Sequence, residues 1–242
     1  MKIDHLVRKL EQFGPLCDDD KAALENAAAD IVEYAAKQDI ISQGDRPVHV
    51  HLLLEGWACR YKILPDGERQ IMAFLIPGDL CDIHVTLLDR MDHSISALSA
   101  CKLLSLPLEY LSGLMRKNDR LSRALSWTTL VDEAILREWL VNLGRRQSEK
   151  RLGHLICEML LRSKAVGLSD GNSFEMPLTQ EELADTMGLT PQHMNKCFQT
   201  LKGKGLISTQ RKQLFVENFE KLVAFSEFDP TYLHQMRDQH EP

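Results

Sequence analysis

The chain has 242 residues, 44% of them apolar and 26% charged, which is an ordinary globular composition for more than one domain. Its net charge of −6 argues against a protein that coats nucleic acid indiscriminately. The start carries scattered charges, and no segment approaches the roughly 20 apolar residues that a membrane span needs, so we expect a cytoplasmic protein without signal peptide or membrane anchor.

Residues 5–36 carry apolar side chains at helical spacing, such as Leu6 and Leu10, then Leu24 and Ala28, then Ile31 and Ala35. This pattern predicts helices that lead into the first domain.

Short strand-like runs follow from residue 40 to residue 106. They lie at 48–54, 58–64, 71–76 and 95–107, and turn-forming residues separate them. Glycines recur at positions 44, 56, 67 and 78, at intervals of 12, 11 and 11. Regular spacing of this kind predicts an antiparallel roll or barrel whose corners use glycine.

Residues 111–145 predict one long helix. Positions 121, 125, 128, 132, 135 and 139 step by four and three, which indicates a heptad-like seam that Asp132 interrupts. A shorter stripe could pack on its own domain, but because this helix is long and has no proline or internal glycine before Gly144, we interpret it as a dimer helix. The predicted dimer contacts are Leu121, Leu125, Thr128, Ile135 and Trp139. A hinge is expected at residues 144–147.

Residues 178–208 have the pattern of a helix-turn-helix. Thr179 is expected to cap the first helix with Glu182 reciprocating, and Gly188 permits the turn. Thr190 is expected to cap the second helix, with Pro191 in its first turn.

The residue spacing in the second helix predicts a buried apolar stripe and an opposite polar face. Met194, Phe198 and Leu201 form the stripe. The predicted base-reading residues on the opposite face are Gln192, His193, Asn195, Lys196 and Gln199. Glutamine and asparagine bond adenine edges, and lysine donates to guanine.

Five cations and no acid lie between Thr190 and Gln213. Past Gly205, two short strands around Arg211 and Lys212 predict a basic wing that holds phosphates. The predicted contacts to the DNA backbone are Thr179, Gln180, Thr190, Lys202, Arg211 and Lys212.

With a glycine-punctuated roll, a long helix and a terminal winged helix in that order, the chain resembles the Crp/Fnr family of bacterial regulators over roughly residues 20–220. The resemblance implies an α+β protein with a cyclic-nucleotide-binding-like antiparallel β-roll, a dimerisation helix and a winged helix-turn-helix. The corresponding ranges are 1–112, 113–146 and 147–225, with a tail at 226–242. It also implies a homodimer on palindromic double-stranded DNA, with Gln192, Asn195 and Lys196 at the base-reading positions. Lys196 stands where most relatives have arginine, whose planar fork lysine lacks.

The sensor half departs from the family pattern. Relatives that bind cyclic nucleotides have a Gly-Glu turn and an Arg-Ser or Arg-Thr pair, whereas here Arg90 precedes Met91, so cyclic AMP is not expected as the effector. Only Cys17 lies where relatives carry a cysteine cluster for an iron–sulfur centre. Cys81 and His84 stay as alternative haem ligands. No cofactor or metal is predicted, and the effector is unknown.

The sequence therefore predicts a DNA-binding transcription regulator with RNA polymerase as a further partner. A signal at the roll, or at its contact with the long helix, would shift two recognition helices into half-site spacing. The alternatives are an interaction protein that does not bind DNA and a haem-based sensor. An enzyme is not expected, because there is no nucleophile elbow, phosphate loop or metal-ligand spacing.

Overall fold

The computed structural model describes residues 3–27 and 30–235. Two short helices, α1 (Asp4–Glu11) and α2 (Asp18–Asn26), precede the roll. The strands of the roll are β1 (Ile31–Tyr34), β2 (Asp39–Ile41), β3 (His49–Glu55), β4 (Ala58–Ile63), β5 (Arg69–Leu75), β6 (Ser94–Ala97) and β7 (Cys101–Pro107). They form two antiparallel sheets, β1-β7-β3 and β2-β6-β4-β5, with a short 3-10 helix, η1 (Ile83–Thr86), between β5 and β6. The predicted antiparallel roll is confirmed.

The four regularly spaced glycines of the roll all have positive φ, between 89° and 97°. At Gly56 a second requirement applies, because a Cβ atom there would lie 2.2 Å from the carbonyl oxygen of Ala100. The regular spacing of the glycines therefore predicted the corners of the roll correctly.

The helix prediction is wrong for residues 31–34, which form strand β1. Ile31 and Val32 are β-branched and pair with Leu104 and Leu103 of β7. Ladder pairing with a distant strand thus decided the local structure. Ala28 of the helical pattern lies outside the described residues.

The predicted single long helix is two helices, α3 (Leu108–Lys117) and α4 (Asp119–Arg145). Asn118 between them is extended, at φ −129° and ψ 97°, and its side chain accepts a hydrogen bond from the backbone of Leu121 (3.1 Å). An asparagine cap of this kind begins a new helix without any proline or glycine.

The second half contains α5 (Ser148–Ala165), β8 (Ser173–Glu175), α6 (Gln180–Met187), α7 (Pro191–Gly203), β9 (Ile207–Gln210), β10 (Gln213–Val216), α8 (Phe219–Ser226) and η2 (Pro230–Leu233). The sheet order is β8-β10-β9. In the tail, Phe228 is buried and Tyr232 donates a hydrogen bond to Glu158 (2.9 Å), which agrees with the expectation that it packs back. The last residues of the predicted tail, 236–242, lie outside the description.

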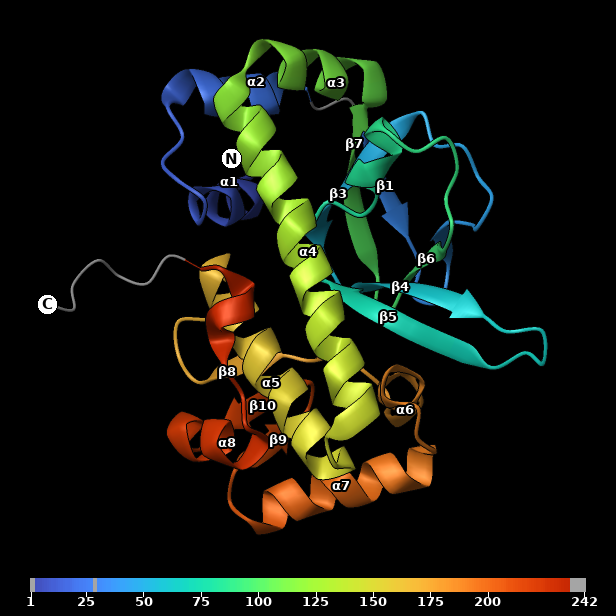
Figure 1. The fold of residues 1–242 in the computed structure, drawn as a ribbon, viewed down its shortest axis with the longest axis vertical. Helices are drawn as coiled ribbons and strands as arrows, with labels where there is room; N and C mark the ends of the chain where they lie inside the picture. The colour runs from blue at the N-terminus through green and yellow to red at the C-terminus, as the bar shows by residue number, and fades with distance from the viewer. Residues whose placement is uncertain (1–2, 28–29, 236–242) are drawn as a thin grey trace, which may run out of the picture.

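Helix α4 runs between the roll and the winged half (Figure 1). One hydrophobic core joins β4 and β5 to α4 and the winged half, and Phe74 of β5 packs edge-on against Trp139 of α4 (5.8 Å between ring centroids). A second core fills the rest of the roll and reaches the first turns of α4. Among helices of the described residues, none combines the length and apolar character of a bilayer span.

Candidate nucleic-acid interface

The predicted caps of the helix-turn-helix are present. Thr179 Oγ1 accepts from the backbone of Glu182 (3.1 Å), and the Glu182 carboxylate accepts from the backbone of Thr179 (2.7 Å). Gly188 ends α6 in the left-handed conformation at φ 62°. Thr190 caps α7 by accepting from the backbone of His193 (3.2 Å), and Pro191 occupies the first turn.

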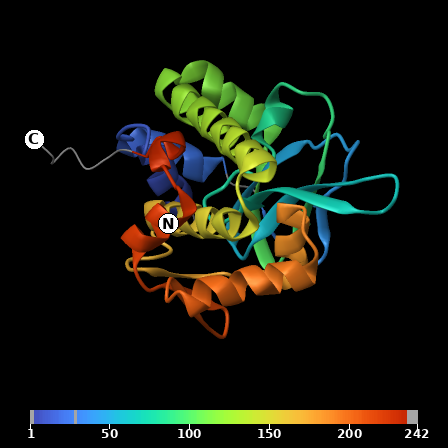
Figure 2. The ribbon, with the colours of Figure 1, turned by 60° about the horizontal axis from the view of Figure 1, so that its bottom comes forward.

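Helix α7 lies along an outer edge of the molecule in both views (Figures 1 and 2). Its buried side is the predicted stripe with Cys197 added, and its solvent side carries the predicted base-reading residues, all exposed: Gln192, His193, Asn195, Lys196 and Gln199. One of them is already bonded, since His193 Nε2 lies 2.9 Å from Ser148 Oγ at the start of α5. The side chains of the other four are exposed to solvent.

The basic segment surrounds this face. Within the described ranges, its five cations form no ion pair with any carboxylate, so their charge is available to phosphates. Arg211 lies at the tip of the turn between β9 and β10 with φ 56°, and Arg211 and Lys212 are both exposed. Lys202 instead donates to Thr209 of the wing (2.6 Å).

Helix α6 packs close to the roll, and its last turn makes the polar contacts. Arg69 of β5 donates to Asp185 (2.7 Å), and the Gln70 side chain donates to the carbonyl of Thr186 (3.2 Å). Thr179 lines a cleft between these elements, and Gln180 is half-buried. These two predicted phosphate contacts therefore lie beside the β4–β5 hairpin, whereas Thr190 is exposed near α7.

The predicted dimer seam lies inside the chain. Its members pack against the roll and the winged half and are at most 6% exposed: Leu121, Leu125, Thr128, Ile135 and Trp139. The apolar side chains that α4 exposes are Leu130 (59%), Leu136 (45%), Leu140 (72%) and Val141 (45%). A second copy can reach only this other side of the helix.

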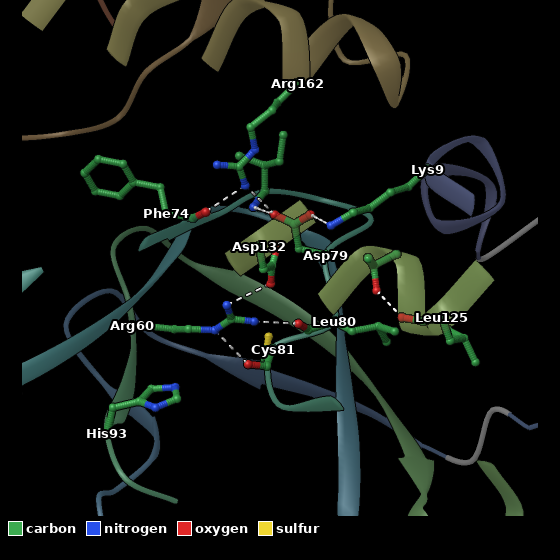
Figure 3. Close-up of polar contacts among 12 residues, drawn as sticks. Lys9, Arg60, Phe74, Asp79, Leu80, Cys81, His93, Leu125, Asp132 and Arg162 are labelled. Carbon is green, nitrogen blue, oxygen red and sulfur yellow. Dashed lines mark hydrogen bonds and ion pairs between the residues drawn. The ribbon is translucent and has the colours of Figure 1, made fainter. Parts of the chain in front are cut away.

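Asp132, which interrupts the seam, pairs with a residue that the sequence did not single out. Arg60 of β4 donates to Asp132 of α4 (2.8 Å) and to the carbonyls of Leu80 and Cys81 (3.1 Å each), as Figure 3 shows. The acidic Asp132 within the apolar seam of α4 was the one sequence signal that this side of the helix meets a buried cation, Arg60. Arg60 thereby ties the roll to α4.

Asp79 joins three elements in the same region (Figure 3). Its carboxylate accepts from Lys9 of α1 (2.6 Å), from Arg162 of α5 (2.9 Å) and from the backbone of Ile76 (2.9 Å). Burial alone would raise the pKa of Asp79, but Lys9 and Arg162 outweigh it and hold that pKa below its ordinary value.

These residues do not fit the phosphate of a cyclic nucleotide. All three nitrogens of the Arg60 guanidinium already donate to groups of its own chain, Arg90 is exposed, and the carboxylates of Asp79 and Asp82 are buried where they would repel an anion. Thiolate ligation of haem does not fit either. Burial and the neighbouring Asp82 raise the pKa of the Cys81 thiol well above its ordinary value, so the thiolate form is disfavoured.

Comparisons with known proteins agree with this architecture. Residues 31–118 match the cyclic nucleotide-binding domain family, and residues 150–225 match the Crp-like helix-turn-helix domain family. The chain is 26% identical over 211 residues to the transcriptional activator protein FnrL of Cereibacter sphaeroides, covering 86% of this chain and 84% of that one. It is 29% identical over 210 residues to the transcriptional activatory protein AadR of Rhodopseudomonas palustris, covering 83% and 82%.

The solved structure of FixK2 from Bradyrhizobium japonicum superposes with a TM-score of 0.74 at 21% identity, covering 81% of this chain and 96% of that one. This likeness shows the shared fold. Because both family matches and the activator relatives point the same way, the chain belongs to the Crp/Fnr family of DNA-binding transcription regulators, which are not enzymes.

Proposed function

We propose that two copies of this chain bind a palindromic DNA site, each inserting α7 into the major groove of one half-site. The exposed polar face of α7 within an acid-free basic segment carries this proposal. Gln192, Asn195 and Lys196 read base edges, while Arg211 and Lys212 of the wing hold phosphates and set the register. Such a regulator acts on the bacterial chromosome in the cytoplasm and recruits or blocks RNA polymerase.

Selection from a pool of random duplexes tests the proposal. The wild-type protein is expected to enrich a palindrome, with binding that weakens as salt rises because phosphate contacts release counterions. When the selection is run at a low and at a high salt concentration, the Lys196→Ala variant should enrich the site poorly at both. If wild-type protein enriches nothing, with or without cell extract as a source of effector, the DNA-binding proposal fails and an interaction role replaces it.

The dimer would form through the exposed side of α4. Leu140 is 72% exposed there, and Val48 in the roll is 70% exposed, so the two offer a matched pair of apolar-to-acid substitutions. Leu140→Glu is expected to weaken the dimer by roughly 30-fold or more, which is about 2 kcal/mol. Val48→Glu should leave it unchanged in sedimentation equilibrium. Equal effects of both variants would contradict this interface.

Signal transmission would use the contacts that join the roll to the other elements. Arg60 reaches Asp132 of α4, and Arg69 reaches Asp185 of α6. A change at the roll that alters either ion pair shifts the population between two placements of α7.

A further inference from the structure

Two histidines that are distant from the DNA-reading face come together in the roll. His84 lies in η1 and His93 directly precedes β6, with 5.3 Å between their ring centroids. Their Nε2 atoms are both buried and have no hydrogen-bond partner among the residues that the structure describes. Since buried polar atoms are nearly always bonded, two such atoms on neighbouring rings mark a candidate ligand site.

Asp92 orients one of these rings. Its carboxylate lies 2.6 Å from His93 Nδ1, so that nitrogen carries a proton and the Nε2 lone pair is left free. A carboxylate behind a histidine is the arrangement that positions metal-binding imidazoles. Donor atoms of His84, Asp92 and His93 all lie within 4.8 Å of one another.

We propose that His84, Asp92 and His93 form a binding site for a divalent first-row transition-metal ion such as Zn²⁺. The two Nε2 atoms are the ligands, Asp92 positions His93, and water completes the coordination. Imidazole suits this class of ion better than it suits Mg²⁺ or Ca²⁺. The proposed site shares His84 with the haem ligands considered above, but it replaces Cys81 with His93 and needs no thiolate.

The geometry requires only a small adjustment. Ligand nitrogens around a tetrahedral ion at 2.0–2.1 Å lie about 3.4 Å apart, and the donor atoms here lie within 4.8 Å of one another, so they must approach by at most about 1.4 Å. The chain two residues before His93 is fixed, because Met91 is buried, donates a backbone hydrogen bond to Asp45 and accepts one from Gly44. Leu87 in the connecting turn is 91% exposed, which leaves the His84 side room to move.

Charges around the cluster are mixed. Arg60 and Lys62 are the cations that act on it, and Asp82 and Asp92 are the opposing carboxylates. Burial lowers the pKa of both histidines, which favours the neutral form that binds metal. Because Arg60 also holds Asp132 of α4, an ion here would act on the link between roll and helix, a consequence that rests on the proposed function.

Titration with Co²⁺, followed by its visible absorption, tests the site in reduced full-length protein stripped with a chelator. Wild type is expected to bind one equivalent that Zn²⁺ displaces. His84→Ala and His93→Ala should each weaken binding at least about tenfold, and Asp92→Asn by about 10- to 100-fold. The Asp92 side chain is 72% exposed, so that variant is expected to keep the fold, which thermal melting verifies.

His49→Ala is the matched control, because His49 also lies in the roll but outside the cluster, and it should bind like wild type. The site is overturned if wild type binds no Co²⁺, if the cluster variants bind as tightly as wild type, or if an intense charge-transfer band shows thiolate ligands. Protein that selects DNA but binds no Co²⁺ overturns only the metal site. Protein that binds Co²⁺ but selects no DNA overturns only the proposed function.

Discussion

The winged half and the roll differ in how far apart their determining residues lie. In the winged half, Thr179 and Glu182 cap one helix, Gly188 ends it and Thr190 starts the next, all within a dozen positions. In the roll, Asp79 depends on Lys9 and Arg162, which are 70 and 83 residues away. Local chemistry dictates the proposed DNA-reading face, whereas the contacts that join the roll to the other elements depend on the completed fold.

The largest effect is expected where long-range contacts converge. Asp79→Ala leaves the half-buried Lys9 without a carboxylate and leaves Arg162 with Glu158 alone, so it should lower the free energy of unfolding by about 3 kcal/mol in denaturant titrations. Glu133→Ala, which removes an exposed pair with Arg137, should change it by about 0.5 kcal/mol or less. If both variants cost the same small amount, the Asp79 cluster does not hold the domains together.

A second long-range contact predicts acid sensitivity. His154 of α5 is fully buried, and burial together with Arg146 lowers its pKa from 6.5 to about 3; its Nε2 lies 3.2 Å from Glu138, which also pairs with Arg146. The folded protein keeps this ring neutral, while the unfolded chain protonates it below pH 6.5. Its stabilising contribution is therefore complete above pH 6.5 and is lost as the pH falls toward 3.

The loss should reach about 2.5 kcal/mol at pH 4.5 relative to pH 7. His154→Gln removes the titrating group, so the difference in unfolding free energy between wild type and variant should shrink by that amount on acidification. If the unfolding free energies of the two proteins instead changed in parallel with pH, His154 would become protonated in the folded protein as readily as in the unfolded chain, which would contradict this account.

A local contact should matter less. Thr179→Ala removes the cap of α6 and is expected to cost about 1 kcal/mol, while Thr179→Ser should retain most of the stability. Chemical denaturation of the three proteins measures this. A loss as large as that of Asp79→Ala would erase the contrast between the two halves.

The same contrast explains what the sequence could and could not predict. The caps, the glycine corners and the two faces of α7 follow from spacing within a few residues. Strand β1 was predicted as helix because its pairing partner is about 70 residues away, and the break at Asn118 was missed because asparagine is also common within polar segments. The apolar seam of α4 was real, but periodicity alone does not say whether a stripe meets its own chain or another.

Residues of the roll were the hardest to foresee. Arg60 gave no local signal, and only Asp132 in the seam indicated that a buried cation was needed. His84 and His93 are nine positions apart with no regular spacing, so only the fold brings them together. Sites assembled from turns of a roll are therefore visible in structure rather than in sequence.

The central claim is that α7 reads bases while the wing holds phosphates, and binding of variants to the selected palindrome and to a shuffled duplex tests it most directly. Gln192→Ala is predicted to lose about 1–3 kcal/mol on the palindrome and almost nothing on the shuffled duplex. Lys212→Ala is predicted to weaken both equally and to reduce the salt slope by about one. The reverse pattern, or equal losses on both duplexes for Gln192→Ala, would contradict the assignment of α7 as the reading helix.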